Sequence, residues 1–108
     1  DLFIVGGFNC YPAEIENLLL QHPLVVECSV VGQADARWGE VAVAVLVLQP
    51  GVPVEDGWAA PFQRFLDGRL ARYKWPRRWL RVDALPKTAL GKVQKAALKT
   101  LLDAPATE

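Results

Sequence analysis

Hydrophobic residues recur along this chain with two different periods, and the change of period separates predicted strands from predicted helices. Residues 24–31 are mostly β-branched and apolar, and residues 41–48 contain no polar side chain at all. Both segments are therefore predicted to be strands that are buried on most of their surface. Ile15, Leu18 and Leu19 instead share one face at helical spacing, which predicts a helix that stops at the His-Pro step just behind it.

Shorter signals predict three of the remaining elements. Residues 2–5 form an apolar run that ends at a glycine pair, which predicts a small strand that leads into a turn. A second helix is predicted over residues 62–70, where Phe and Leu recur at helical spacing although Gly68 lies within it. Residues 79–82 can form one more strand.

The last predicted helix begins at Lys92, directly after the loop of residues 86–91. At about 100° per residue, its apolar and basic side chains fall on opposite arcs. The arc expected to face the core holds Val93, Ala97, Leu98 and Leu101, and the opposite arc holds Lys92, Lys95 and Lys99. We therefore expect Lys92 to stand at the start of an amphipathic helix and to point away from the core.

The order of these elements predicts the fold class. The connection over residues 32–40 is short enough for an antiparallel pairing of the two long strands. The chain is therefore expected to form an α+β domain, with helices packed on a small, mostly antiparallel sheet. We expect one domain over residues 1–103, no internal repeat, and a flexible tail over residues 104–108.

Length and composition exclude several classes of protein. The chain has 108 residues, of which 52% are hydrophobic and 22% charged, which suits one packed domain and excludes disordered and fibrous chains. No apolar run approaches the roughly 18 residues of a membrane span, and the start lacks the basic end of a signal peptide. We expect a soluble, cytoplasmic domain.

Cys10 and Cys28 are too few for a disulfide framework and are expected to be reduced thiols. His22 is the only histidine, so we expect no zinc site and no Ser/His or Cys/His nucleophile.

The zero net charge conceals an asymmetry between the two halves of the chain. Residues 1–58 hold eight acidic residues and one basic residue, whereas residues 59–108 hold four acidic and eleven basic residues. A cationic half suits a phosphate-bearing partner, such as a nucleotide, a coenzyme or a nucleic acid. Alternatively, neighbouring faces of one domain pair these charges with each other.

Three separate segments carry candidate chemistry. They are the glycine pair followed by Phe-Asn-Cys-Tyr-Pro-Ala-Glu-Ile-Glu at 6–16, Asp-Ala-Arg-Trp-Gly-Glu at 35–40, and Pro-Lys-Thr-Ala-Leu-Gly-Lys at 86–92. In this order and at these separations they resemble the C-terminal domain of the adenylate-forming enzymes. That superfamily includes acyl-CoA and aryl-CoA synthetases, peptide-synthetase adenylation domains and luciferases. The resemblance extends from Asp1 to about Leu102.

The resemblance implies that this chain is one part of an enzyme. In the family, a large N-terminal domain binds ATP, Mg²⁺ and a small carboxylic acid, and the small domain closes over it in two successive orientations. The first step joins the carboxylate to AMP and releases pyrophosphate, and the second transfers the acyl group to coenzyme A. We therefore expect the partner N-terminal domain to lie upstream of Asp1, the isolated piece to be inactive, no nucleic acid to be bound and no membrane span to be present.

The resemblance also assigns roles to individual residues. Lys92 matches the catalytic lysine, whose compact, movable charge would bridge carboxylate and phosphate during adenylate formation. Gly6 and Gly7 match the turn that lines the pantetheine channel, where the absence of a Cβ atom permits a close backbone approach. Trp38 and Tyr73 match aromatic residues near the coenzyme A nucleotide, on which an adenine ring can stack. On spacing alone, these would be a solvated lysine, an ordinary turn and two packing aromatics.

Several positions depart from the family pattern near the coenzyme site. Trp75 stands where related ligases can hold an arginine that reaches a coenzyme phosphate, and the nearest basic residues are Lys74, Arg77 and Arg78. Phe8 stands at a site that is often acidic, so we expect it to alter the lining of the channel or the contact between domains. The coenzyme-binding residues implied by the resemblance are Gly6, Gly7, Phe8, Trp38, Tyr73 and Lys74.

Two features favour the coenzyme A ligases within the superfamily. Peptide-synthetase domains usually carry an Asp-Arg pair where this chain has Gln94-Lys95, and the Gly-Gly-x-Asn-x-Tyr-Pro start is similar to that of acyl-CoA and aryl-CoA ligases. We therefore expect an acid–coenzyme A ligase whose fatty or aromatic acid the sequence does not identify. The alternatives are a domain from another branch, a small phosphate-binding or nucleic-acid-binding module, and a purely structural interaction domain.

Overall fold

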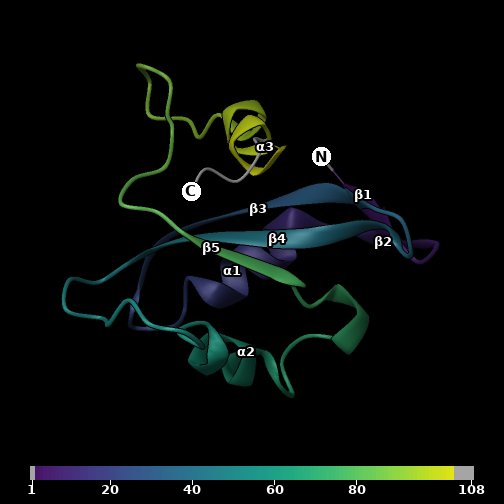
Figure 1. Cartoon of the computed structure of the whole chain (residues 1–108), viewed down its shortest axis with the longest axis horizontal. Coiled ribbons are helices and arrows are strands. Elements are labelled where there is room, and N and C mark those ends of the chain that lie inside the picture. Colours follow the sequence, from purple (N-terminus) through teal and green to yellow (C-terminus); the bar gives the residue numbers. More distant parts are fainter. Residues whose placement is uncertain (1, 104–108) are drawn as a thin grey trace.

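A computed structural model describes residues 2–103 of the chain (Figure 1). Within this range the chain forms a five-stranded sheet, three α-helices and one short 3-10 helix. In chain order the elements are β1 (Phe3–Val5), β2 (Phe8–Cys10), α1 (Pro12–Leu19), β3 (Val25–Asp35), β4 (Gly39–Leu48), α2 (Ala60–Leu66), η1 (Arg72–Lys74), β5 (Arg78–Arg81) and α3 (Lys95–Asp103). The tail predicted over residues 104–108 lies outside the described residues.

The sheet is mostly antiparallel, which confirms the predicted fold class. Strands β3 and β4 form its long antiparallel pair, and the order along the main path is β2-β1-β4-β3. Strand β5 also pairs with β4, in parallel, next to the short β1 contact at Gly39. Strand β3 therefore forms one edge of the sheet.

Helices cover both faces of the sheet, with α1 and α2 on one face and α3 on the other (Figure 1). The inward side chains of β4 divide between two cores. Ala42, Ala44 and Leu46 pack with the α1 and α2 face, whereas Val43 and Val45 pack with Leu85 and Leu98 on the α3 face. This double covering explains why residues 41–48 contain no polar side chain.

The first half of the chain contains more strand than the sequence pattern predicted. Residues 8–10 form a second short strand, and β3 and β4 extend into the segment expected to connect them. Only residues 36–38 remain as a turn, so the expected connection over residues 32–40 was too long. The extension follows from the backbone pairing, which continues to Asp35 and Gly39 although the hydrophobic pattern has already ended.

The second helix is shorter than predicted. Helix α2 ends at Leu66 because Asp67 adopts an extended backbone, with φ −64° and ψ 124°. Gly68 therefore lies outside the helix, and Leu70 reaches the core from the following segment with only 7% of its surface exposed. There the Leu70 carbonyl accepts a hydrogen bond from the Trp75 indole at 2.9 Å.

The prediction of a helix start at Lys92 was wrong. Helix α3 begins at Lys95 because the preceding residues complete a small hairpin, closed by an antiparallel bridge between Lys87 and Val93. The predicted arcs shift accordingly: Leu101 is 58% exposed, and Leu102 packs against the core in its place.

Two other sequence expectations can be compared with the described residues. Cys10 and Cys28 are both free thiols, as predicted. No helix in this part of the chain is long and apolar enough to cross a membrane.

Candidate functional site

The glycine pair forms a tight turn between β1 and β2. Gly6 and Gly7 have φ values of 56° and 88°, and Val5 pairs with Phe8 across the turn. Two successive positive φ angles are typical of a two-residue hairpin turn and strongly favour glycine. A Cβ atom built on Gly7 would meet no other atom within 4 Å, so the turn presents bare backbone to its surroundings.

Trp38 contacts this turn through both its backbone and its ring. The Gly6 N–H donates a hydrogen bond to the Trp38 carbonyl at 2.8 Å, and a Cβ atom on Gly6 would lie 3.3 Å from the Trp38 ring. The Trp38 backbone is held in turn by Asp35, whose carboxylate accepts the N–H groups of Arg37 and Trp38 at 3.0 and 2.9 Å. The guanidinium carbon of Arg77 lies 4.2 Å from the Trp38 ring centroid. Trp38 is thus a partly buried packing residue with a cation against its ring.

A second group of aromatic and basic side chains lies beside the turn. The rings of Phe8 and Tyr73 lie 5.3 Å apart at 49°, and these residues are 63% and 40% exposed. The Lys74 ammonium lies 2.7 Å from the Glu14 carboxylate. This hydrogen bond raises the pKa of Lys74, so its charge is retained at neutral pH. Tyr73 therefore offers an exposed ring next to a permanent cation.

The basic residues around Trp75 face different partners. The Arg72 guanidinium lies 4.3 Å from the Trp75 ring centroid, whereas Arg78 donates a hydrogen bond to Gln33. Of Lys74, Arg77 and Arg78, the basic residues named from the sequence, it is Arg77 that lies against the ring of Trp38, the residue in contact with the glycine turn.

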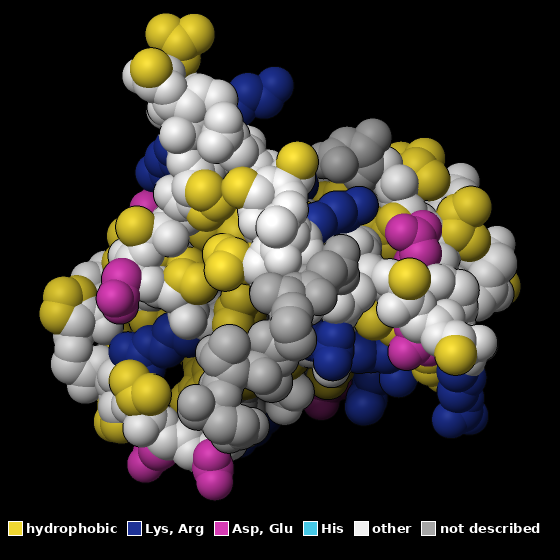
Figure 2. Space-filling model, turned by 45° about the horizontal axis from the view of Figure 1, so that its top comes forward, with side chains coloured by type: hydrophobic (Ala, Val, Ile, Leu, Met, Phe, Trp, Pro, Cys, Tyr) yellow, Lys and Arg dark blue, Asp and Glu magenta, His cyan; other side chains and the backbone are white. Residues whose placement is uncertain are grey.

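Lys92 lies on an exposed loop whose shape depends on Thr88. The Thr88 N–H donates to the Lys92 carbonyl at 2.8 Å, and the Lys92 N–H donates to the Thr88 hydroxyl at 3.2 Å. Gly91, at φ 86°, completes the turn with a 2.9 Å bond to the Thr88 carbonyl. Leu90 is 97% exposed. Figure 2 shows a projection from the body of the molecule that ends in hydrophobic side chains with basic side chains beside it.

The structure therefore separates the candidate residues into two places. Gly6 contacts Trp38, and Phe8 contacts Tyr73, so the residues assigned to coenzyme A gather near the β1–β2 turn. The loop that carries Lys92 precedes α3 and lies at the opposite side of the view from that turn (Figure 1).

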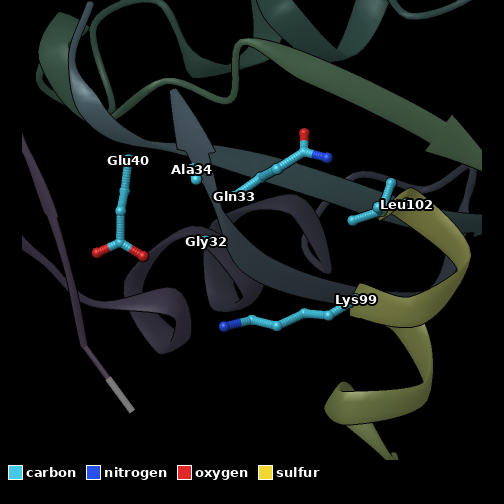
Figure 3. A pocket seen from close by; sticks show the side chains of 6 residues that line it. All are labelled: Gly32, Gln33, Ala34, Glu40, Lys99 and Leu102. Carbon is cyan, nitrogen blue, oxygen red and sulfur yellow. The ribbon is translucent and has the colours of Figure 1, made fainter. Parts of the chain in front are cut away.

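A cavity of about 230 Å³ is lined by residues outside the candidate set. It opens between α3 and the ends of β3 and β4 (Figure 3). Its lining residues are Gly32, Gln33, Ala34, Glu40, Lys99 and Leu102, none of which was a candidate site residue. Among the candidate residues, Phe8, Tyr73 and Lys92 are exposed, whereas Trp38 is partly buried.

Three residues gained a structural role that the sequence analysis had not assigned. Asp35 holds the backbone of Trp38, Glu14 holds Lys74, and Thr88 shapes the Lys92 loop. The spacing of Asp35 two and three residues before its N–H donors is typical of an Asx turn, so that role had a readable local signal. The Glu14–Lys74 pair spans 60 residues and had none.

The chain belongs to the AMP-binding enzyme C-terminal domain family, whose model matches residues 14–92. The indoleacetate–CoA ligase of Aromatoleum aromaticum is 48% identical over 102 residues, which are 94% of this chain and 19% of that ligase. The 2-succinylbenzoate–CoA ligase of Bacillus pumilus is 45% identical over 100 residues, which are 93% of this chain and 20% of that ligase. The crystal structure of apo MatB from Rhodopseudomonas palustris matches with a TM-score of 0.85 and 42% identity, over 94% of this chain and 20% of that one.

The chain thus spans about a fifth of the length of the curated relatives it matches. Within the described residues, no three His, Cys, Asp or Glu side chains gather in a way that could hold a metal ion.

Proposed function

We propose that residues 1–103 form the C-terminal domain of an ATP-dependent, AMP-forming acid–coenzyme A ligase. Membership of the AMP-binding C-terminal family and the similarity to ligases of indoleacetate and 2-succinylbenzoate support this proposal. The observation that carries it is the separation of an exposed lysine on one loop from a glycine turn with exposed aromatic and basic side chains. Such a domain can bring first the Lys92 loop and then the glycine turn to the same nucleotide site on a larger domain.

Lys92 serves the first step, in which the carboxylate forms a bond to the α-phosphorus of ATP and the bond to pyrophosphate breaks. Two anions approach each other in this step, and negative charge develops on the phosphoryl oxygens. The Lys92 ammonium has no hydrogen-bond or ion-pair partner among the described residues, so its charge is available to bridge the two anions. A flexible stem and a point charge suit this role better than the rigid fork of arginine.

The glycine turn serves the second step, in which the coenzyme A sulfur bonds to the acyl carbon and AMP leaves. The bare backbone of Gly6 and Gly7 permits the pantetheine arm to pass closely. Tyr73 and Phe8 offer exposed rings to the coenzyme, and Lys74 offers a cation to its phosphates. Trp38 supports the turn and is packed against Arg77, so we assign it a positioning role in place of adenine stacking.

The remaining groups of the reaction are assigned to the larger domain. We infer that ATP, Mg²⁺ and the small carboxylic acid are held mainly there, because this chain corresponds to only about a fifth of the length of the ligases it matches. No step above depends on a metal ligand from this chain.

The test is Lys92→Ala in the full-length protein, with the two half-reactions measured separately. Adenylate formation, followed by pyrophosphate exchange into ATP, should fall by about 10²- to 10³-fold, as for loss of a key charge-stabilising group. Thioester formation from supplied acyl-adenylate and coenzyme A should be largely retained. Lys99→Ala removes an exposed lysine of the same charge from α3 and should leave both rates unchanged. Equal effects of the two substitutions on adenylate formation would refute the assignment.

A further inference from the structure

Two ion pairs flank the loop that carries Lys92, and both lie next to strand β3. Before Lys92, the Lys87 ammonium lies 2.5 Å from the Glu27 carboxylate of β3. After it, the Lys95 ammonium lies 2.9 Å from the Glu16 carboxylate of α1. The two basic residues thus bracket Lys92 at both ends of its hairpin.

The pair formed by Glu16 and Lys95 is built into the edge of the sheet. The Glu16 carboxylate also accepts the Val30 N–H at 2.8 Å, and the Lys95 ammonium also donates to the Val30 carbonyl at 3.1 Å. The side chains of Glu16 and Lys95 are only 19% and 28% exposed. Both backbone groups of Val30 on the outer edge of β3 therefore bind to one ion pair, which connects α1, β3 and the start of α3.

The loop has few other attachments to the domain. Val93 is only partly buried, Leu90 is 97% exposed, and the bridge between Lys87 and Val93 closes the hairpin on itself. The internal hydrogen bonds through Thr88 define the shape of the loop but not its position on the sheet. Its position therefore depends on the two ion pairs and on the packing of Leu85 and Leu98 behind it.

We propose that Glu16 and Lys95 are positioning residues for Lys92, and that Glu27 and Lys87 assist them at the other end of the loop. This inference rests on the proposed function of Lys92. A charge that must meet two approaching anions acts only within a narrow range of positions, and a displacement of about 1 Å can lower a rate by about 10²-fold. The ion pairs hold the base of the hairpin, while the Lys92 side chain remains exposed at the end of its long stem.

The test is Lys95→Gln in the full-length protein, with Lys99→Gln on the next turn of α3 as the matched control. We expect Lys95→Gln to lower the kcat of adenylate formation by about ten- to hundredfold with little change in the KM for ATP. Thioester formation from supplied acyl-adenylate should stay close to the unmodified rate. Lys95→Arg should restore adenylate formation, because a guanidinium can still reach both Glu16 and the Val30 carbonyl.

Three outcomes would overturn the inference. They are an equal loss in both half-reactions, a result no different from Lys99→Gln, and a failure of Lys95→Arg to restore the rate. If Lys95→Gln does not fold, Glu27→Gln provides the second variant, since its ion pair is more exposed. It should lower adenylate formation selectively, and an unchanged rate would again overturn the inference.

Lys92→Ala separates this inference from the proposed function. If Lys92→Ala leaves adenylate formation intact, the proposed function itself is wrong. If Lys92→Ala abolishes that step while Lys95→Gln and Glu27→Gln do not affect it, only the positioning role is wrong.

Discussion

At the scale of single residues, the structure separates side chains that the sequence leaves equivalent. Lys74, Lys87 and Lys95 each form an ion pair with a glutamate, whereas Lys92 stands exposed. The sequence pattern had placed Lys95 on the solvated arc of a helix together with Lys92. That part of the prediction was wrong, because Lys95 turns toward the edge of β3.

His22 is held by one local hydrogen bond and by two aromatic contacts. Its Nδ1 accepts the Leu24 N–H at 3.1 Å, and its ring packs edge-on against Phe62 and Phe65. Burial lowers the pKa of His22, which favours the neutral form that this hydrogen bond requires. The histidine is therefore a packing residue and not a candidate base.

Cys28 gives a prediction at this scale. Burial, with a smaller contribution from the Glu16 carboxylate, raises the pKa of its thiol from 9.0 to about 12. Above about pH 9 the unfolded chain loses this proton while the folded chain retains it, so the unfolded state binds fewer protons and stability falls as the pH rises. The free energy of unfolding should decrease by up to about 1.4 kcal/mol per pH unit from this group.

Urea unfolding of the chain and of Cys28→Ala over a series of alkaline pH values would measure this contribution. The substitution should reduce the slope of stability against pH, whatever it does to stability at neutral pH. Parallel curves for the two proteins would show that the thiol ionises equally in both states.

At the scale of elements, the two loops that carry candidate chemistry are tight turns held by hydrogen bonds. The glycine turn is supported by Trp38 and, through it, by Asp35, and the Lys92 loop is shaped by Thr88. Sequence motifs located both loops. They did not reveal the second strand after the glycine pair, because Phe8 and Asn9 are exposed and carry no hydrophobic period.

The glycine turn gives a prediction at the element scale. Gly7→Val forces a branched side chain onto a φ of 88° and fills the open space in front of the turn. Thioester formation from supplied acyl-adenylate should fall by at least about tenfold, in line with the loss of close approach, while adenylate formation is largely kept.

Gly57→Val provides the matched control. Gly57 has a φ of 78°, is exposed, and also has no atom within 4 Å of an added Cβ, so it carries the same backbone strain away from the glycine turn. If the two valine variants lose thioester formation to the same extent, the effect is backbone strain and the channel role of Gly7 is wrong.

At the scale of the whole molecule, the fold brings the acidic first half of the chain against the basic second half. Glu14, Glu16 and Glu27 pair with Lys74, Lys95 and Lys87 respectively. Arg37 and Arg77 both lie against the Trp38 ring and form no ion pair within residues 2–103. The charge asymmetry had two explanations, a phosphate-bearing partner and pairing of charges within the domain. These three ion pairs show that internal pairing accounts for part of the asymmetry.

This pairing predicts that binding to nucleic acid is weakened. Titration of the chain with single-stranded and double-stranded oligonucleotides across a series of salt concentrations should give a lower affinity and a shallower salt slope than the number of basic residues alone suggests, because three of them are already paired with glutamates and cannot replace counterions. Tight binding with a steep slope would instead favour the alternative of a nucleic-acid-binding module.

The fold class was predictable because strands and helices in this chain differ in a local property, the period of their hydrophobic residues. The long pair of β3 and β4, helix α1 and the core residue Leu98 all followed from that period. Element ends were predicted less well at Leu66, where the extended backbone of Asp67 ends the helix, and at Lys95, where the bridge between Lys87 and Val93 occupies the residues before the helix.

The sequence by itself determined most of the elements, the family and the two loops that carry the candidate chemistry, because each of these depends on residues close together in the chain. Tertiary structure decided the parallel pairing of β5 with β4, the contact between Trp38 and the glycine turn, and the hydrogen bond of Lys95 to the Val30 carbonyl at the edge of β3. These depend on groups up to 65 residues apart, such as Val30 and Lys95, which meet only after the sheet has formed. No local pattern of residues encodes such contacts, since their energy depends on the distance between groups that folding alone brings together.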